Sequence, residues 1–186
     1  MRYIILLLCI SAVNLVYAQE NVRYTGTAEG GLLTGSKGAS TFIFTTQGIQ
    51  FKGNSFGVGS GIDFYGFSSV PLFVDVKRKF TNKNKQPFIE AGAGFNFTNS
   101  NSSAVKDHYN YAYGSGKFDN GFFARGGGGL LFRANKKINF FLSAGYQYKT
   151  ASYTYTPLIN PFVGQTQPIK DIYHFNRWYI GAGIGW

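Results

Sequence analysis

Charged residues at alternating positions are the first candidates for chemistry in this chain. They fall in segments where large apolar residues alternate with small or polar ones, and they share the small-residue side. The acidic and basic members of this set are Glu29, Asp63, Asp75 and Glu90, and Lys77, Arg125, Lys149 and Arg177. If these segments enclose a common interior, the ionised groups lose their water and must pair. We therefore expect a buried charge network, which serves either as a structural plug or as the gate of a narrow ion path.

A second candidate is a tyrosine-rich segment near the middle of the chain. Tyr109, Tyr111 and Tyr113 lie in the range Asn99–Asn120, which is rich in Asn, Ser and Gly and has no apolar period. Tyrosine beside small polar residues is typical of adaptable binding surfaces. We expect a long surface loop that contacts an extracellular ligand. The alternative is that the tyrosines only pack at a membrane interface.

The elements that must position these residues are β-strands. From residue 22 the sequence divides into alternating segments separated by turn residues, with no helical periodicity. The expected strands cover residues 22–33, 40–52, 55–65, 70–80, 87–98, 121–133, 138–153 and the segment after 173. The alternation of the second strand shifts phase, which predicts a bulge near Thr45–Gly48. A second long loop is expected at Thr154–Tyr173, where three of the five prolines lie.

The last ten residues, from Arg177 to Trp186, give the clearest pattern. Every second residue from Trp178 onward is apolar, and the opposite side carries a charge, a tyrosine and glycines. In a transmembrane barrel such an apolar face contacts lipid, whereas in a soluble sheet it would face a core. The segment resembles the C-terminal targeting strand of bacterial outer-membrane proteins. In that family's spacing the assembly signal falls on Tyr179, Gly181, Ile184 and Trp186.

The chain as a whole resembles the small eight-stranded outer-membrane β-barrel family, of the kind formed by the OmpA transmembrane domain and OmpX. The resemblance implies an all-β fold, an eight-stranded antiparallel up-and-down transmembrane β-barrel that covers residues 19–186. It also implies contact with outer-membrane lipid and insertion by the barrel-assembly machinery. The expected role is structural or adhesion-like, through two external loops at 99–120 and 154–173. A narrow ion channel with a charged lumenal gate is the alternative.

Some barrels of this size modify lipid A and use a histidine with a serine and an acidic residue to do so. The two histidines of this chain are therefore candidates for catalysis. His108 has Asp107 beside it, and His174 has Asp171 nearby, but no His-x-Ser arrangement occurs. We therefore assign no catalytic residue, and a lipid A hydrolase is the last of the alternatives. Because Cys9 is the one cysteine and belongs to the leader described next, the sequence also predicts no metal site and no cofactor.

The first eighteen residues predict a secretory signal peptide that is cleaved before Gln19. Arg2 precedes an apolar run, and Val16–Ala18 forms a small-residue cleavage pattern. Charged residues are 14% of the chain and aromatic residues 18%, whereas soluble domains carry about a quarter charged residues. The net charge is +10, yet the basic residues cluster at turns. We therefore expect attraction to anionic lipid headgroups and no binding of nucleic acid.

Strand parity predicts the orientation. If the mature chain starts in the periplasm, the odd-numbered links lie outside the cell and the even-numbered links inside. Both long links are odd-numbered, and both Lys/Arg-rich turns, near residues 77–85 and 133–137, are even-numbered. Long external loops and short internal turns are the known asymmetry of such barrels.

Overall fold

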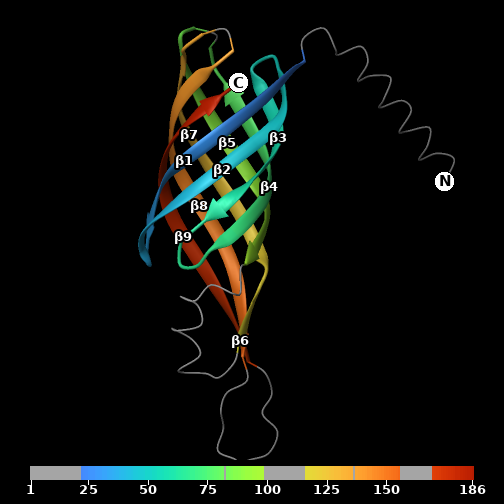
Figure 1. The fold of residues 1–186 in the computed structure, drawn as a ribbon, viewed down its shortest axis with the longest axis vertical. Coiled ribbons are helices and arrows are strands. Elements are labelled where there is room, and N and C mark those ends of the chain that lie inside the picture. The colour runs from blue at the N-terminus through green and yellow to red at the C-terminus, as the bar shows by residue number, and fades with distance from the viewer. Residues whose placement is uncertain (1–21, 82, 99–115, 136, 156–168) are drawn as a thin grey trace, which may run out of the picture.

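The computed structural model describes residues 22–81, 83–98, 116–135, 137–155 and 169–186. These residues form a single closed wall of strands (Figure 1). The strands are β1 (Arg23–Gly35), β2 (Gly38–Phe51), β3 (Asn54–Asp63), β4 (Ser69–Lys79), β5 (Lys85–Thr98), β6 (Gly116–Asp119), β7 (Gly121–Arg133), β8 (Asn139–Tyr155) and β9 (Ile169–Gly185). Within the described ranges there is no helix of the length and apolar character needed to cross a membrane.

All pairings are antiparallel. Strands β1 to β5 pair in sequence order, β5 pairs with β7, β7 with β8 and β8 with β9, and β9 also pairs with β1, so the sheet closes on itself. The strands β6 and β7 both pair with β8 and together form one side of the barrel. Asp119 pairs with Ser152 of β8, and Phe123 pairs with Lys149. The β6–β7 side therefore advances four residues where β8 advances three, and the extra residue forms a bulge. With β6 and β7 counted as one bulged strand, the barrel has eight strands, and the predicted eight-stranded up-and-down barrel is confirmed.

The bulge predicted in the second strand is wrong. The register of β2 against β1 and β3 is unbroken through Thr45–Gly48. The apparent phase shift arises because Thr45 and Gln47 point outward and satisfy their polar groups on the outer wall. The Gln47 amide donates to Thr45 Oγ1 over 3.1 Å, Thr45 Oγ1 donates to the Thr27 carbonyl over 3.0 Å, and the Tyr24 hydroxyl donates to Gln47 Oε1.

The strands also run further than predicted into the ranges 99–120 and 154–173. Strand β6 lies within the first range, and β8 and β9 continue as a ladder to the pair Tyr155 and Ile169 in the second. Tyrosine, threonine and isoleucine in this ladder favour extended backbone. The predicted loop boundaries there are corrected accordingly.

The two ends of the barrel differ. The "turn end" carries the short links β2–β3, β4–β5 and β7–β8 and residue Trp186, and it lies at the top of Figure 1. The "loop end" carries the links β1–β2, β3–β4, β5–β6 and β8–β9. The ranges that contain the two predicted long loops therefore start and finish at the same end.

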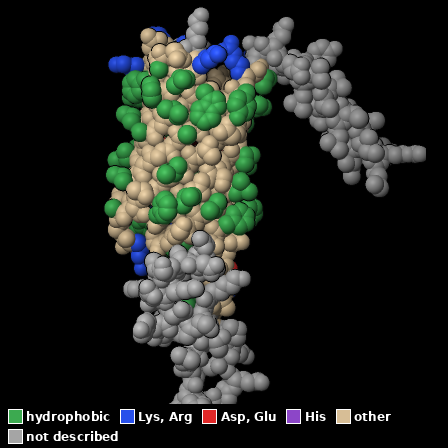
Figure 2. Space-filling model, viewed as in Figure 1, with side chains coloured by type: hydrophobic (Ala, Val, Ile, Leu, Met, Phe, Trp, Pro, Cys, Tyr) green, Lys and Arg blue, Asp and Glu red, His purple; other side chains and the backbone are tan. Residues whose placement is uncertain are grey.

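The outer wall is apolar and the interior carries the charges. Ile180 is 70% exposed and Phe95 is 67% exposed, whereas Asp63 and Arg177 are fully buried. In Figure 2 apolar side chains are spread over the visible wall, and most of the visible lysine and arginine side chains lie at the turn end. A wall of this kind is costly in water, but it matches the hydrocarbon layer of a membrane, as the alternating pattern predicted.

Candidate functional site in the barrel lumen

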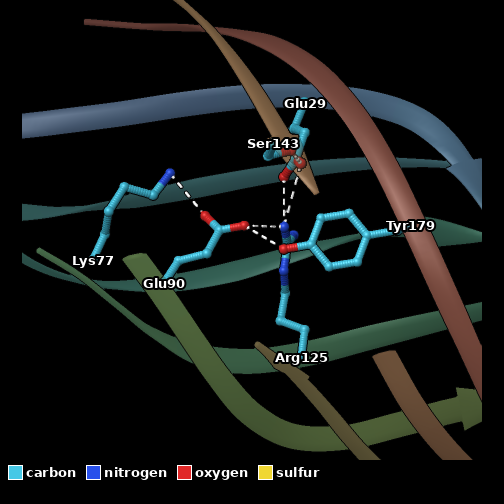
Figure 3. Close-up of polar contacts among 6 residues, drawn as sticks. All are labelled: Glu29, Lys77, Glu90, Arg125, Ser143 and Tyr179. Atoms are coloured by element: carbon cyan, nitrogen blue, oxygen red, sulfur yellow. Dashed lines mark hydrogen bonds and ion pairs between the residues drawn. The ribbon is translucent and has the colours of Figure 1, made fainter. Parts of the chain in front are cut away.

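A cluster of polar side chains crosses the middle of the lumen. We call Glu29, Lys77, Glu90, Arg125, Ser143 and Tyr179 the central cluster, and Figure 3 shows them pointing toward one another. Each comes from a different strand, namely β1, β4, β5, β7, β8 and β9. The cluster therefore joins opposite sides of the wall through side chains as well as through the backbone ladder.

Arg125 is the centre of this cluster. Its Nη2 atom lies 2.9 Å from a carboxylate oxygen of Glu29 and 2.5 Å from Oε1 of Glu90. The Ser143 hydroxyl donates a further hydrogen bond of 2.5 Å to Glu29. The guanidinium also lies over the Tyr179 ring, 4.8 Å from its centroid. Two carboxylates and an aromatic face thus compensate a guanidinium that is removed from water.

Glu90 is the second hub. Lys77 lies directly opposite it on the neighbouring strand, and the Lys77 ammonium is 3.0 Å from Glu90 Oε2. The Tyr179 hydroxyl donates to the other oxygen, Oε1, over 2.8 Å. On its far side the Lys77 ammonium lies between two rings, 4.7 Å from the centroid of Phe88 and 4.8 Å from that of Phe141. These rings and the Glu90 carboxylate together compensate the Lys77 ammonium.

Glycines make room for the two assembly-signal residues that face inward. A Cβ atom on Gly127 would collide with the Tyr179 hydroxyl, and one on Gly145 would lie 2.7 Å from the Tyr179 ring. A Cβ atom on Gly181 would collide with the Glu29 carboxylate. Tyr179 and Gly181 therefore take part in lumenal packing. Of the other two signal residues, Ile184 is exposed on the outer wall, and Trp186 is partly exposed at the turn end, where it borders a cavity.

A second polar group lies nearer the loop end. We call Asp63, Ser69, Lys149 and Arg177 the loop-end cluster. The Asp63 carboxylate pairs with the Arg177 guanidinium and lies 3.4 Å from the Lys149 ammonium, and all three side chains are fully buried. Lys149 also donates to Ser69 Oγ over 3.0 Å, and the Tyr65 backbone N–H donates to Asp63 over 2.8 Å. One carboxylate here balances two cations.

Aromatic rings cover this cluster. The Lys149 ammonium lies 4.3 Å from the Phe67 centroid and 5.5 Å from the Phe175 centroid. The Phe67 ring in turn packs on Phe118, at 5.1 Å, and on Phe175, at 5.4 Å. Arg177 lies over the Tyr65 ring at 5.4 Å. The rings exclude water and supply part of the compensation that a second carboxylate would otherwise give.

The space between the two clusters is filled by further rings, which the sequence reasoning did not single out. Phe44 and Phe73 lie 5.7 Å apart, and Phe73 and Phe123 lie 5.1 Å apart, each measured between ring centroids. A signal for them was present in the sequence, because Phe73 shares the parity of Asp75, and Phe123 shares that of Arg125.

Asp75 is the exception within the predicted network. It is buried, but no hydrogen bond or ion pair joins its side chain to any described residue, and it lines a cavity at the turn end. The predicted contact residues Tyr109, Tyr111 and Tyr113 lie outside the described residues, as do His108 and the segment 1–18.

The second histidine lies on the outer face of β9. Its Nδ1 atom is 2.7 Å from the Tyr148 hydroxyl, and the His174 ring stacks on the Tyr148 ring. Asp171 is three residues away and therefore points to the opposite face of the strand. No group of three His, Cys, Asp or Glu side chains is placed to hold a metal ion in the described part of the chain.

Comparison with known proteins identifies the fold. No family model and no curated protein sequence matches the chain. Among solved structures, the outer membrane protein OprG from Pseudomonas aeruginosa is similar at 12% identity, over 89% of this chain and 94% of that chain, with a TM-score of 0.52. Neisserial surface protein A is similar at 14% identity, over 89% and 98%, with a TM-score of 0.52. The chain has the fold of the small eight-stranded outer-membrane β-barrels.

Proposed function

We propose that the protein is a plugged barrel of the bacterial outer membrane with a structural and surface-interaction role. The observation that carries this proposal is the inverted distribution of polarity: exposed Ile, Leu, Val and Phe side chains cover the wall, and the ionised groups are paired inside. Outer-membrane lipid is the partner that suits such a wall, and a terminal strand with Tyr179, Gly181, Ile184 and Trp186 suits recognition by the barrel-assembly machinery.

The packing of the lumen favours a plug over the narrow ion channel. The central cluster ties six strands together, and the rings of Phe44, Phe73 and Phe123 occupy the space next to it. An ion on this path would have to displace paired charges as well as rings. An eight-stranded barrel is just wide enough for side chains to fill it, and these side chains do so.

The surface-interaction part of the proposal rests on the ranges 99–120 and 154–173. Both begin and finish at the loop end, and the first contains Tyr109, Tyr111 and Tyr113. If the turn end faces the periplasm, these segments face the outside of the cell. One of the two similar structures is itself named a surface protein, which is in keeping with this orientation.

The first test concerns location and closure. The protein is expected in the outer-membrane fraction, with an electrophoretic mobility in SDS that differs between unheated and boiled samples, because a closed barrel resists the detergent until heated. A monodisperse mature chain in buffer without detergent would overturn the membrane assignment.

The second test separates scaffold from adhesin. A variant with Tyr109, Tyr111 and Tyr113 changed to Ser, and a variant with residues 100–114 replaced by a short Gly-Ser link, should both keep the heat-dependent mobility. Both should lose whole-cell adherence to mucin-coated and fibronectin-coated surfaces. Tyr24→Ser, on the outer wall at the turn end, is the control and should adhere normally. If all of these strains adhere equally, the surface-interaction role fails while the structural role stands.

The hydrolase alternative has its own readout. Mass spectrometry of lipid A from cells with the wild-type protein and with His174→Ala should give identical spectra. A mass change that depends on His174 would instead establish a lipid A-modifying enzyme.

A further inference from the structure

A cavity of about 610 Å³ opens at the turn end of the barrel. Its inner part is lined by Asp75, Lys77, Leu131 and Phe141, and its outer part by Arg23 and Arg133 among others. At its inner end Lys77, a member of the central cluster, lies between the rings of Phe88 and Phe141. The volume falls in the range of small-molecule sites. The cavity is therefore large enough for a ligand of modest size.

The charge of this chamber is strongly one-sided. The basic side chains that line it are Arg23, Lys77, Lys79, Arg133 and Lys137, and the one acidic side chain is Asp75. Lys77 is engaged by Glu90, and Lys79 donates to Gln50 over 2.7 Å. By contrast, no ion pair joins Arg23, Arg133 or Lys137 to an acidic side chain of the described residues. These three cations leave unbalanced positive charge, which a concave site of low dielectric concentrates.

The chamber also offers apolar and hydrogen-bonding surface. Leu131 and Phe141 are almost fully buried and line its inner part. The Ser55 hydroxyl lines the same chamber, is buried, and has no hydrogen-bond partner among the described residues. A ligand with an anionic head and an apolar body would use the cations, the free hydroxyl and the apolar inner wall together.

We propose that the turn-end cavity binds a phosphate-bearing amphiphile, with its phosphate at Arg23, Arg133 and Lys137 and its apolar body against Leu131 and Phe141. Phosphate is preferred because a doubly charged group matches several cations, and arginine presents paired donors that fit phosphate oxygens. The same phosphomonoester group is found in soluble phosphate esters and in the headgroup of phosphatidic acid. The cavity adjoins the central cluster at Lys77, but the residues proposed to hold the ligand belong neither to that cluster nor to the proposed external contacts.

The test is a binding titration with phenyl phosphate on the folded barrel in zwitterionic detergent, followed by phosphorus NMR. Wild-type protein should bind phenyl phosphate more tightly than inorganic phosphate, and phenol should not bind measurably. The double variant Arg133→Gln/Lys137→Gln should bind phenyl phosphate roughly tenfold more weakly. The matched control, Lys37→Gln/Lys170→Gln, removes two exposed cations at the loop end and should bind within about twofold of wild type.

Two results would overturn the site. One is equal weakening in the cavity and control variants, which would mean that binding follows net charge. The other is no measurable wild-type binding at roughly 10 mM phenyl phosphate, weaker than any functional affinity. The variants change exposed side chains, so all of them should retain heat-dependent mobility. A loss of binding then means that the site is altered while the barrel is still folded.

A second arm identifies the source of the phosphate. The barrel is placed in phosphatidylcholine nanodiscs with or without phosphatidic acid, in a Trp178→Phe background where Trp186, which lines the cavity, is the remaining tryptophan. If phosphatidic acid abolishes the change in Trp186 fluorescence on addition of phenyl phosphate, a lipid headgroup occupies the site. If it does not, the ligand is a soluble phosphomonoester. Both results support phosphate binding in the cavity. If phenyl phosphate changes the Trp186 fluorescence in neither kind of nanodisc, the proposed site is contradicted.

Discussion

The central cluster and the loop-end cluster solve the same problem in different ways. In the central cluster two carboxylates, Glu29 and Glu90, face two cations, Lys77 and Arg125, and the hydroxyls of Ser143 and Tyr179 donate to the carboxylates. In the loop-end cluster Asp63 alone faces both Lys149 and Arg177, and aromatic rings lie against both cations. Rings lie against the cations of both clusters, but in the central cluster the carboxylates equal the cations in number, whereas at the loop end one carboxylate serves two cations.

This difference predicts how each cluster fails. In the central cluster Glu90 keeps a cation when either Lys77 or Arg125 is lost, because both pair with it. At the loop end, loss of the single carboxylate leaves two buried cations with only rings and neutral acceptors around them. An unpaired buried charge costs far more than a lost pair. The following variants test the comparison, from the largest expected effect to the smallest.

Asp63→Asn should be the most damaging. It leaves Lys149 and Arg177 without a counter-charge and should lower the free energy of unfolding by about 5 kcal/mol. The measurement is urea unfolding of the barrel in lipid vesicles, followed by tryptophan fluorescence. Asp171→Asn removes an exposed carboxylate of β9 at the same end and should have little effect. A small loss for Asp63→Asn, equal to that of the control, would mean that the aromatic rings suffice.

Arg125→Ala should cost somewhat less, about 3–4 kcal/mol, because Lys77 still compensates Glu90 while Glu29 loses its cation. The double variant Glu29→Gln/Arg125→Ala should recover part of that loss, since it removes the orphaned charge. Thermal unfolding that is unchanged in Arg125→Ala would show that the lumenal charges are solvated, and the central cluster would then not be a plug.

Phe67→Leu tests the aromatic contribution at the loop end. The change keeps an apolar side chain but removes the ring that lies over the Lys149 ammonium, and about 1–2 kcal/mol should be lost. Phe95→Leu, a ring on the outer wall, is the control and should change stability less. Equal losses of stability in the two variants would indicate that the Phe67 ring stabilises the barrel only by filling space, and not through its contact with the Lys149 ammonium.

The cavity variant Arg133→Gln/Lys137→Gln should leave the unfolding free energy within about 0.5 kcal/mol of wild type, since neither cation has a counter-charge to lose. A marked destabilisation would show that these cations belong to the structure and not to a binding site. A gain in stability beyond this range would show that they repel each other at a cost to the fold.

Alternation was sufficient to predict the barrel, the inward side of most strands and the terminal strand. It failed at Thr45 and Gln47, where it predicted a bulge. These polar side chains point outward and hydrogen-bond to each other, so the sequence looks as if the inward and outward positions were exchanged there. It also missed β6, where four residues, Gly116–Asp119, are held as a strand by their pairing with β8. Local pattern contains no information about such pairing partners.

The same limit applies to the site. Parity places Arg125 and Glu29 on the inner face, but the stagger of the closed sheet brings them together across the lumen. Phe67 lies in the link between β3 and β4, where no alternation exists to reveal its contact with Lys149. The cavity likewise depends on which basic residues converge at the turn end. These features follow from closure, and sequence spacing alone does not specify them.

The most direct test of the account is the steady-state conductance of the purified barrel in a planar lipid bilayer. A lumen filled by the two clusters and the rings between them should give insertions with no stable current above background at moderate voltage. A reproducible ohmic current in most insertions would contradict the plug and restore the ion path.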